Sequence, residues 1–142
     1  MHTAEHILNQ TMVRMFNRGR SFSSHIEKKK SKCDYRFDRD LTAEEVAEIE
    51  QRVNGIIRAD LPVREEFISR QEGERAYDLG RLPDSAGETL RIVRVGDYDA
   101  CPCSGSHASS SAEIGEFKIV STGFENGVLR IRFKIADRPE SP

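Results

Sequence analysis

Two pairs of potential metal ligands, one near each end of the chain, constrain the fold more than any other feature. The first pair is His2 and His6, the second is Cys103 and His107, and each pair has three intervening residues. Imidazole nitrogen and thiolate sulfur suit Zn²⁺, whereas Mg²⁺ and Ca²⁺ prefer oxygen ligands. The spacing therefore predicts one zinc site, and a fold that brings two distant segments together.

Length, charge and cysteine content narrow the class of protein. At 142 residues, the chain suits one domain with a real core, and we expect residues 1–136 to form it and residues 137–142 to be a polar tail. The formal net charge is −2, so any contact with nucleic acid must be local. The three cysteines, together with the lack of a leader or bilayer-length apolar stretch, favour a cytoplasmic protein.

Helical periodicity is clearest in two segments. In residues 1–17, apolar residues form one stripe, while His2 and His6 lie one turn apart on a neighbouring stripe and can face one ion. Gly19 is expected to end this helix. A second helix begins after Thr42, which forms a capping box with Glu45.

Strand patterns occupy most of the rest of the chain. The Cys33, Tyr35 and Phe37 side chains are expected to point inward from the first strand, and a hairpin is expected to turn within residues 123–127. The predicted strands are 31–38, 62–69, 90–95, 116–121 and 128–135. A short charged helix is expected at 70–79, and a loop carries Cys101 and the second ligand pair. The pattern predicts an α+β fold, a two-layer α/β sandwich with helices on one mainly antiparallel sheet.

The ligand pattern by itself does not separate a structural from a catalytic zinc. Structural sites use a closed set of four protein ligands, whereas catalytic sites usually keep one position open beside three. With four candidate ligands, both interpretations stay open.

Three stretches, HTAEHIL, RIVRVGDYDACPCSGSH and EIGEFKIVS, resemble the editing domain of alanyl-tRNA synthetases and its free-standing relatives, the AlaX proteins. A more distant similarity connects them to the editing domain of threonyl-tRNA synthetases. The resemblance spans nearly the whole chain and implies a two-layer sandwich. It also implies four zinc ligands, which are His2, His6, Cys103 and His107.

The resemblance implies hydrolysis of the ester that joins serine or glycine to alanine tRNA. An alanine site cannot exclude glycine by size and discriminates little against one added hydroxyl, so a second, hydrolytic site is needed. Because the resemblance begins at His2, we expect the protein to act in trans on tRNA already charged. Serine on threonine tRNA is an alternative substrate.

Candidate substrate-binding residues flank the ligand pairs. Many family members have Cys-Gly-Gly-Thr-His-Val where this chain has Cys-Ser-Gly-Ser-His-Ala, so Ser104 and Gly105 are expected to shape the pocket. Ser21 and Ser24 are further candidates, although ordinary turn residues would read the same way.

Glu5 raises a second enzymatic interpretation. Residues 2–6 read His-x-x-Glu-His, the order in which a zinc peptidase uses two histidines as ligands and the glutamate as general base. Such a peptidase would leave Cys103 and His107 unexplained. Glu5 is retained as a candidate catalytic residue of the hydrolase.

A lysine-rich run is the candidate contact with tRNA. It contains Lys28, Lys29, Lys30 and Lys32. These side chains could bind phosphates without base specificity, although a solvated loop has the same composition. The alternative function is therefore a zinc-stabilised RNA-binding module without catalytic activity.

The choice of thiolate ligand is testable. Cys103, unlike Cys101, has the three-residue gap to His107, so Cys103→Ala is expected to lower the zinc content of the purified protein more than Cys101→Ala. Elemental analysis measures both, and equal retention by the two variants would contradict the assigned ligand set.

Overall fold

The computed structural model describes residues 2–27, 30–69, 71–72, 89–102 and 110–136. The elements in chain order are α1 (His2–Phe16), β1 (Ser23–His25), β2 (Ser31–Arg36), α2 (Ala43–Arg58), β3 (Val63–Ser69), β4 (Thr89–Val95), β5 (Asp99–Pro102), η2 (Ser111–Glu113), β6 (Glu116–Glu125) and β7 (Val128–Ala136).

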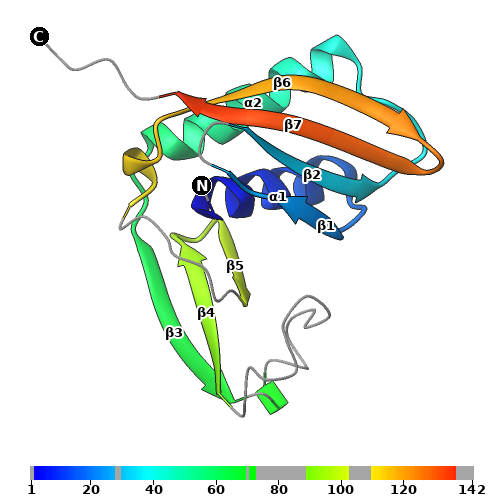
Figure 1. Ribbon diagram of the computed structural model, residues 1–142. Coiled ribbons are helices and arrows are strands. Elements are labelled where there is room, and N and C mark those ends of the chain that lie inside the picture. Colours follow the sequence, from blue (N-terminus) through cyan, green and yellow to red (C-terminus); the bar gives the residue numbers. More distant parts are fainter. Residues whose placement is uncertain (1, 28–29, 70, 73–88, 103–109, 137–142) are drawn as a thin grey trace, which may run out of the picture.

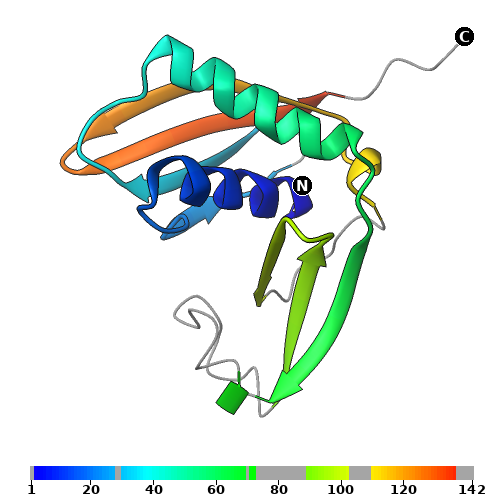
Figure 2. The same ribbon diagram turned by 180° about the vertical axis from the view of Figure 1, so that it is seen from behind.

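These elements form an α+β sandwich with a second, smaller sheet. A four-stranded sheet has the order β1-β2-β7-β6, and α1 and α2 cover one of its faces (Figures 1 and 2). Its strand pairs are antiparallel. The expected two-layer α+β fold is confirmed. The expectation of one sheet is wrong, because β3, β4 and β5 pair with each other in a sheet that extends away from the sandwich (Figure 1).

Helix α1 packs its apolar stripe into the core as the periodicity predicts. Ile7, Leu8 and Met12 are buried against the sheet and α2. The helix ends at Phe16, before Gly19, because Asn17 already adopts a left-handed backbone with φ of 54°. Its amide donates to the Val13 carbonyl at 2.9 Å. The chain then turns back toward β1.

The capping box predicted for α2 is present. The Glu45 amide donates to the Thr42 hydroxyl at 3.1 Å, and the Thr42 amide donates to the Glu45 carboxylate at 2.9 Å. Arg39 also contacts this carboxylate, at 2.6 Å. The hydrogen bond from Arg39, followed by that from Thr42, lowers the pKa of Glu45 to about 2.

The hairpin of β6 and β7 is longer and tighter than predicted. Its loop is the dipeptide Asn126-Gly127, whose φ values of 51° and 78° match the left-handed conformation of a two-residue hairpin turn. Consequently, Gly123 lies within β6 and pairs with Arg130.

Three of the other expected strands were predicted correctly from the local sequence pattern. Strands β2, β3 and β4 lie within one or two residues of their predicted bounds, and Cys33, Tyr35 and Phe37 are buried. Strands β1 and β5 were not predicted. The expected loop around Cys101 is in part strand β5, because Gly96, with φ of 50°, allows β4 to turn back directly. The predicted helix at 70–79 lies mostly outside the described residues.

No helix in the described part of the chain is long and apolar enough to cross a membrane.

The low pKa of Glu45 predicts a contribution to acid stability. A carboxylate whose pKa is lower in the folded protein stabilises it above the unfolded pKa, near 4.5, and this stabilisation is lost as the pH falls toward about 2. We expect Glu45→Gln to lower the free energy of unfolding at pH 7 by up to about 1 kcal/mol, with the difference from wild type shrinking below pH 4. Denaturant titrations at several pH values measure this. Glu48→Gln, on the same helix, is the control and should follow wild type.

Candidate metal centre

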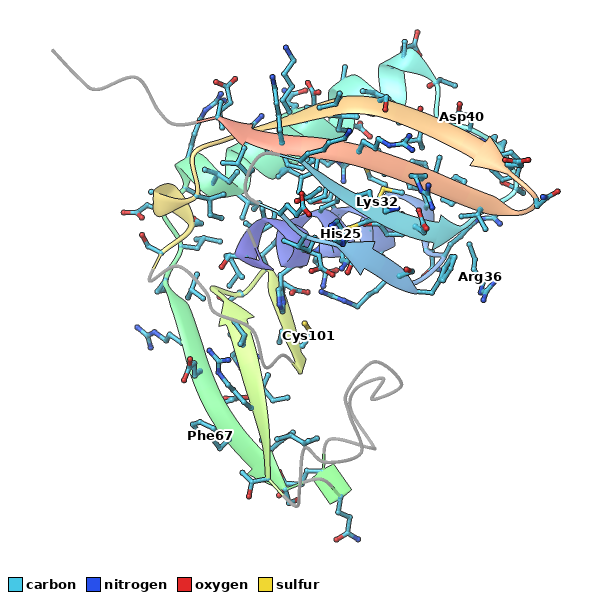
Figure 3. All side chains as sticks on the ribbon, viewed as in Figure 1. His25, Lys32, Arg36, Asp40, Phe67 and Cys101 are labelled. Carbon is cyan, nitrogen blue, oxygen red and sulfur yellow. The ribbon has the colours of Figure 1, made fainter. Side chains whose placement is uncertain are left out.

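Helix α1, which carries the first predicted ligand pair, meets the smaller sheet at strand β5. Strand β5 lies beside α1, and Cys101 on it faces the sandwich (Figures 1 and 3). The short segment between α1 and β1 adds Arg20 to the same place. Asp99 and Cys101 thus contact His6 across 93 and 95 positions of the sequence, and Arg20 contacts Asp99 across 79.

The imidazole of His6 is buried, with 4% of the residue exposed. Its Nδ1 lies 3.1 Å from Asp99 Oδ2 and 2.8 Å from Cys101 Sγ, while Nε2 lies 3.8 Å from that sulfur. A carboxylate on Nδ1 favours the tautomer that carries the proton there, which leaves the Nε2 lone pair for a metal. The geometry is that of a ligand histidine oriented by an acidic neighbour.

The Asp99 carboxylate is fully buried and accepts four hydrogen bonds. Gln10 Nε2 (3.0 Å) and Arg20 Nη1 (2.7 Å) donate to Oδ1, and His6 Nδ1 (3.1 Å) and Arg20 Nη2 (3.3 Å) donate to Oδ2. Burial alone raises the pKa of Asp99, but the hydrogen bond from His6 and the charge of Arg20 outweigh it, so the pKa lies below its ordinary value. Asp99 is therefore held as an anion whose acceptor positions are already used.

Cys101 completes a group that fits a zinc ion in its donor chemistry. Its half-buried sulfur lies 3.4 Å from Arg20 Nη2, and one ligand atom each from His6, Asp99 and Cys101 lies within 4.8 Å of the others. Nitrogen and sulfur donors suit Zn²⁺. Asp99 already accepts four hydrogen bonds, one of them from His6, and the Cys101 sulfur lies beside the same imidazole.

The other predicted ligands are placed only in part. His2 is the first residue of α1, one turn before His6 as expected, but its side chain is not among those described. Cys103 and His107 lie outside the described residues, as do Ser104 and Gly105. The four-ligand set therefore stays a prediction.

Glu5, Ser21 and Ser24 lie on the side of α1 that faces β1. Ser24 Oγ donates to Glu5 Oε1 at 3.1 Å, and the Ser21 amide donates to the side chain of Asn9 at 3.0 Å. Glu5 is buried, with 8% exposed, and is not part of the metal-binding group found among the described residues. Its catalytic role stays a prediction.

The lysine-rich run is described at two of its four positions. Lys30 and Lys32 line a surface hollow with His25 and Arg132, whereas Lys28 and Lys29 lie outside the described residues.

The sequence did not identify Arg20 or Gln10 as part of this site, and it favoured Cys103 over Cys101 as the thiolate ligand. Of the two acidic residues in this segment, Asp99 contacts His6, whereas Asp97 is exposed. Recognising β5 as a strand would have put Asp99 and Cys101 on one face. No local signal marks Arg20.

Comparison with known proteins adds independent information. Residues 90–132 match the family described as the threonyl and alanyl tRNA synthetase second additional domain. Over 93% of its length, the chain is 34% identical to an alanine–tRNA ligase of Halorubrum lacusprofundi and 33% identical to one of Methanopyrus kandleri. It is 30% identical, over 92% of its length, to one of Idiomarina loihiensis. The chain spans about 15% of the length of these relatives.

Proposed function

Because the chain belongs to the editing-domain family of the alanyl-tRNA synthetases, we propose that it is a zinc-dependent hydrolase acting in trans on mischarged tRNA. Its substrate would be serine or glycine esterified to alanine tRNA, which places the reaction in the cytoplasm where tRNAs are charged. The observation that carries the proposal is the buried imidazole of His6, oriented by Asp99 at a junction of helix and sheet.

The zinc ligands in this proposal are His2, His6, Cys103 and His107, with Cys101 beside them. Zinc would supply a Lewis acid that orients the aminoacyl group or activates the attacking water. Donor chemistry supports this assignment, since His6 Nε2 and Cys101 Sγ, a nitrogen and a sulfur donor, lie 3.8 Å apart.

The protein's own residues would hold the site in a single protonation state. Asp99 would keep the proton of His6 on Nδ1, which would leave the Nε2 lone pair to hold a metal. Arg20 stabilises the buried carboxylate through two hydrogen bonds and balances its charge. Gln10 donates to the same carboxylate at 3.0 Å and restricts its rotation.

Glu5, which directly precedes His6 on α1, is the candidate acceptor of a proton from the attacking water. Ser24 fixes its carboxylate at 3.1 Å. Ser21, Ser24, Ser104 and Gly105 are proposed to line the amino-acid pocket. An aminoacyl ester is an activated bond, so positioning a water molecule near it needs less acid–base assistance than peptide hydrolysis.

A zinc-stabilised RNA-binding module without catalytic activity is the second candidate. The saturated Asp99 carboxylate is equally compatible with it, because a closed structural site would use the same anchoring of His6. The two candidates share the metal and tRNA and differ only in hydrolysis.

Deacylation of defined substrates separates the two candidates. The zinc-loaded protein is incubated with alanine tRNA charged with serine, glycine or alanine, and with threonine tRNA charged with serine. We expect loss of serine or glycine from alanine tRNA at least tenfold faster than loss of alanine, and removal of zinc with a chelator should abolish it. If no mischarged tRNA is deacylated faster than in buffer, the hydrolase proposal is wrong and the zinc-stabilised RNA-binding module is the remaining candidate.

The role of Asp99 can be tested through metal affinity alone. Asp99→Asn removes the charge that orients His6 and leaves Arg20 without its anion, so zinc affinity is expected to fall about 10- to 100-fold. Competition with a chromophoric chelator measures it. Asp97→Asn is the matched control at an exposed neighbouring position and should retain wild-type affinity. Equal zinc affinity of the two variants would contradict a positioning role for Asp99.

A further inference from the structure

One face of the four-stranded sheet is left uncovered by the helices. Both α1 and α2 pack on the opposite face (Figures 1 and 2). In the two central strands, residues alternate between the core and this open face. The outward residues of β2 and β7 are Lys32, Asp34, Arg36, Arg130, Arg132 and Lys134. Five of these six positions are basic.

This concentration of positive charge contrasts with the rest of the molecule. The chain as a whole has a formal net charge of −2. Helix α2, on the other side of the sheet, carries four glutamates against two arginines. The charges are therefore segregated between the two faces, and a segregated basic face attracts polyanions.

A cationic row crosses three strands of the open face. His25 pairs with Lys32, and Lys32 pairs with Arg132, in the register of β1, β2 and β7. These residues, with Lys30 among their neighbours, line a hollow of about 240 Å³ (Figure 3 labels His25 and Lys32). The hollow lies where successive phosphates of a strand could be contacted from adjacent β-strands.

The row retains charge that is not neutralised by nearby carboxylates. Asp34 pairs with Arg130 through hydrogen bonds of 2.8 and 3.0 Å, and His25 with Glu27 at 2.7 Å. Among the described residues, Lys32 and Arg132 have no carboxylate ion-pair partner. Within the row, these two cations are available to a ligand.

An aromatic platform at the end of the same face favours a nucleic acid over other polyanions. The guanidinium of Arg36 lies 4.5 Å from the ring centroid of Phe22, and 39% of Phe22 is exposed. An exposed aromatic ring beside an arginine is a surface on which an unpaired base can stack.

The edge strand connects this face with the candidate metal centre. In β1, His25 points to the open face, while the preceding Ser24 bonds Glu5 of α1, the neighbour of His6. We propose that the open sheet face, with Lys32 and Arg132 at its centre, binds the sugar–phosphate backbone of the tRNA whose 3′ end enters that centre. This proposal rests on tRNA as the partner in the proposed function.

Binding of uncharged alanine tRNA to the full chain tests the proposal without any ester hydrolysis. Fluorescence anisotropy over a range of salt concentrations compares wild type with the Lys32→Gln/Arg132→Gln variant. We expect the variant to bind at least tenfold more weakly in about 0.1 M salt. The slope of log affinity against log salt should decrease in magnitude by about 2, one for each lost phosphate contact, and by about 1 in the single Arg132→Gln variant.

The matched control is Arg52→Gln/Arg58→Gln, which removes the same charge from α2 on the opposite side. It should bind within about twofold of wild type. Wild-type affinity and slope in the Lys32/Arg132 variant, or an equal loss in the α2 control, would overturn the proposal. If tRNA binding depends on Lys32 and Arg132 but the protein deacylates no tRNA, the hydrolase proposal is wrong and the proposed tRNA-binding surface is still supported.

Discussion

The buried carboxylate of Asp99 is the interaction on which the candidate site depends. A charge without solvent is costly unless it is paired and hydrogen-bonded. Here the compensation comes from Arg20, His6 and Gln10, with Arg20 contacting both oxygens. Loss of any of these contacts would leave a buried charge undercompensated, so Asp99 constrains where β5 can lie against α1.

The same junction joins the two sheets. Helix α1 packs on α2 and the larger sheet, and also contacts β5 of the smaller one. A second connection is made by Ser111, whose hydroxyl accepts from the Leu61 amide at 2.7 Å and donates to the Ile56 carbonyl at 2.8 Å. The entry to β3 and the approach to β6 are therefore tied together, and the smaller sheet is attached through both of its edge strands, β3 and β5.

Two surfaces of different character follow from this arrangement. The junction between α1 and β5 is largely buried and combines imidazole, thiol and carboxylate, which suits a small ligand such as a metal ion. The open face of the larger sheet is broad and basic, which suits a long polyanion. Strand β1 borders both, through Ser24 on one side and His25 on the other. A large substrate with a small reacting end matches that division.

The sequence by itself determined what depends on neighbouring residues. The capping box of Thr42 and Glu45, the alternation in β2 and the Asn126-Gly127 turn are local interactions, and they produced the correct elements. The spacing of His2 and His6 likewise placed both on one helix. Tertiary structure alone decided the pairing of β1 with β2 and of β5 with β4, because β1 and β5 are too short to carry a periodic signal. It also decided the contact of Arg20 with Asp99. Those two residues are separated by 79 positions, and a buried ion pair becomes favourable only when the packed fold excludes water around it.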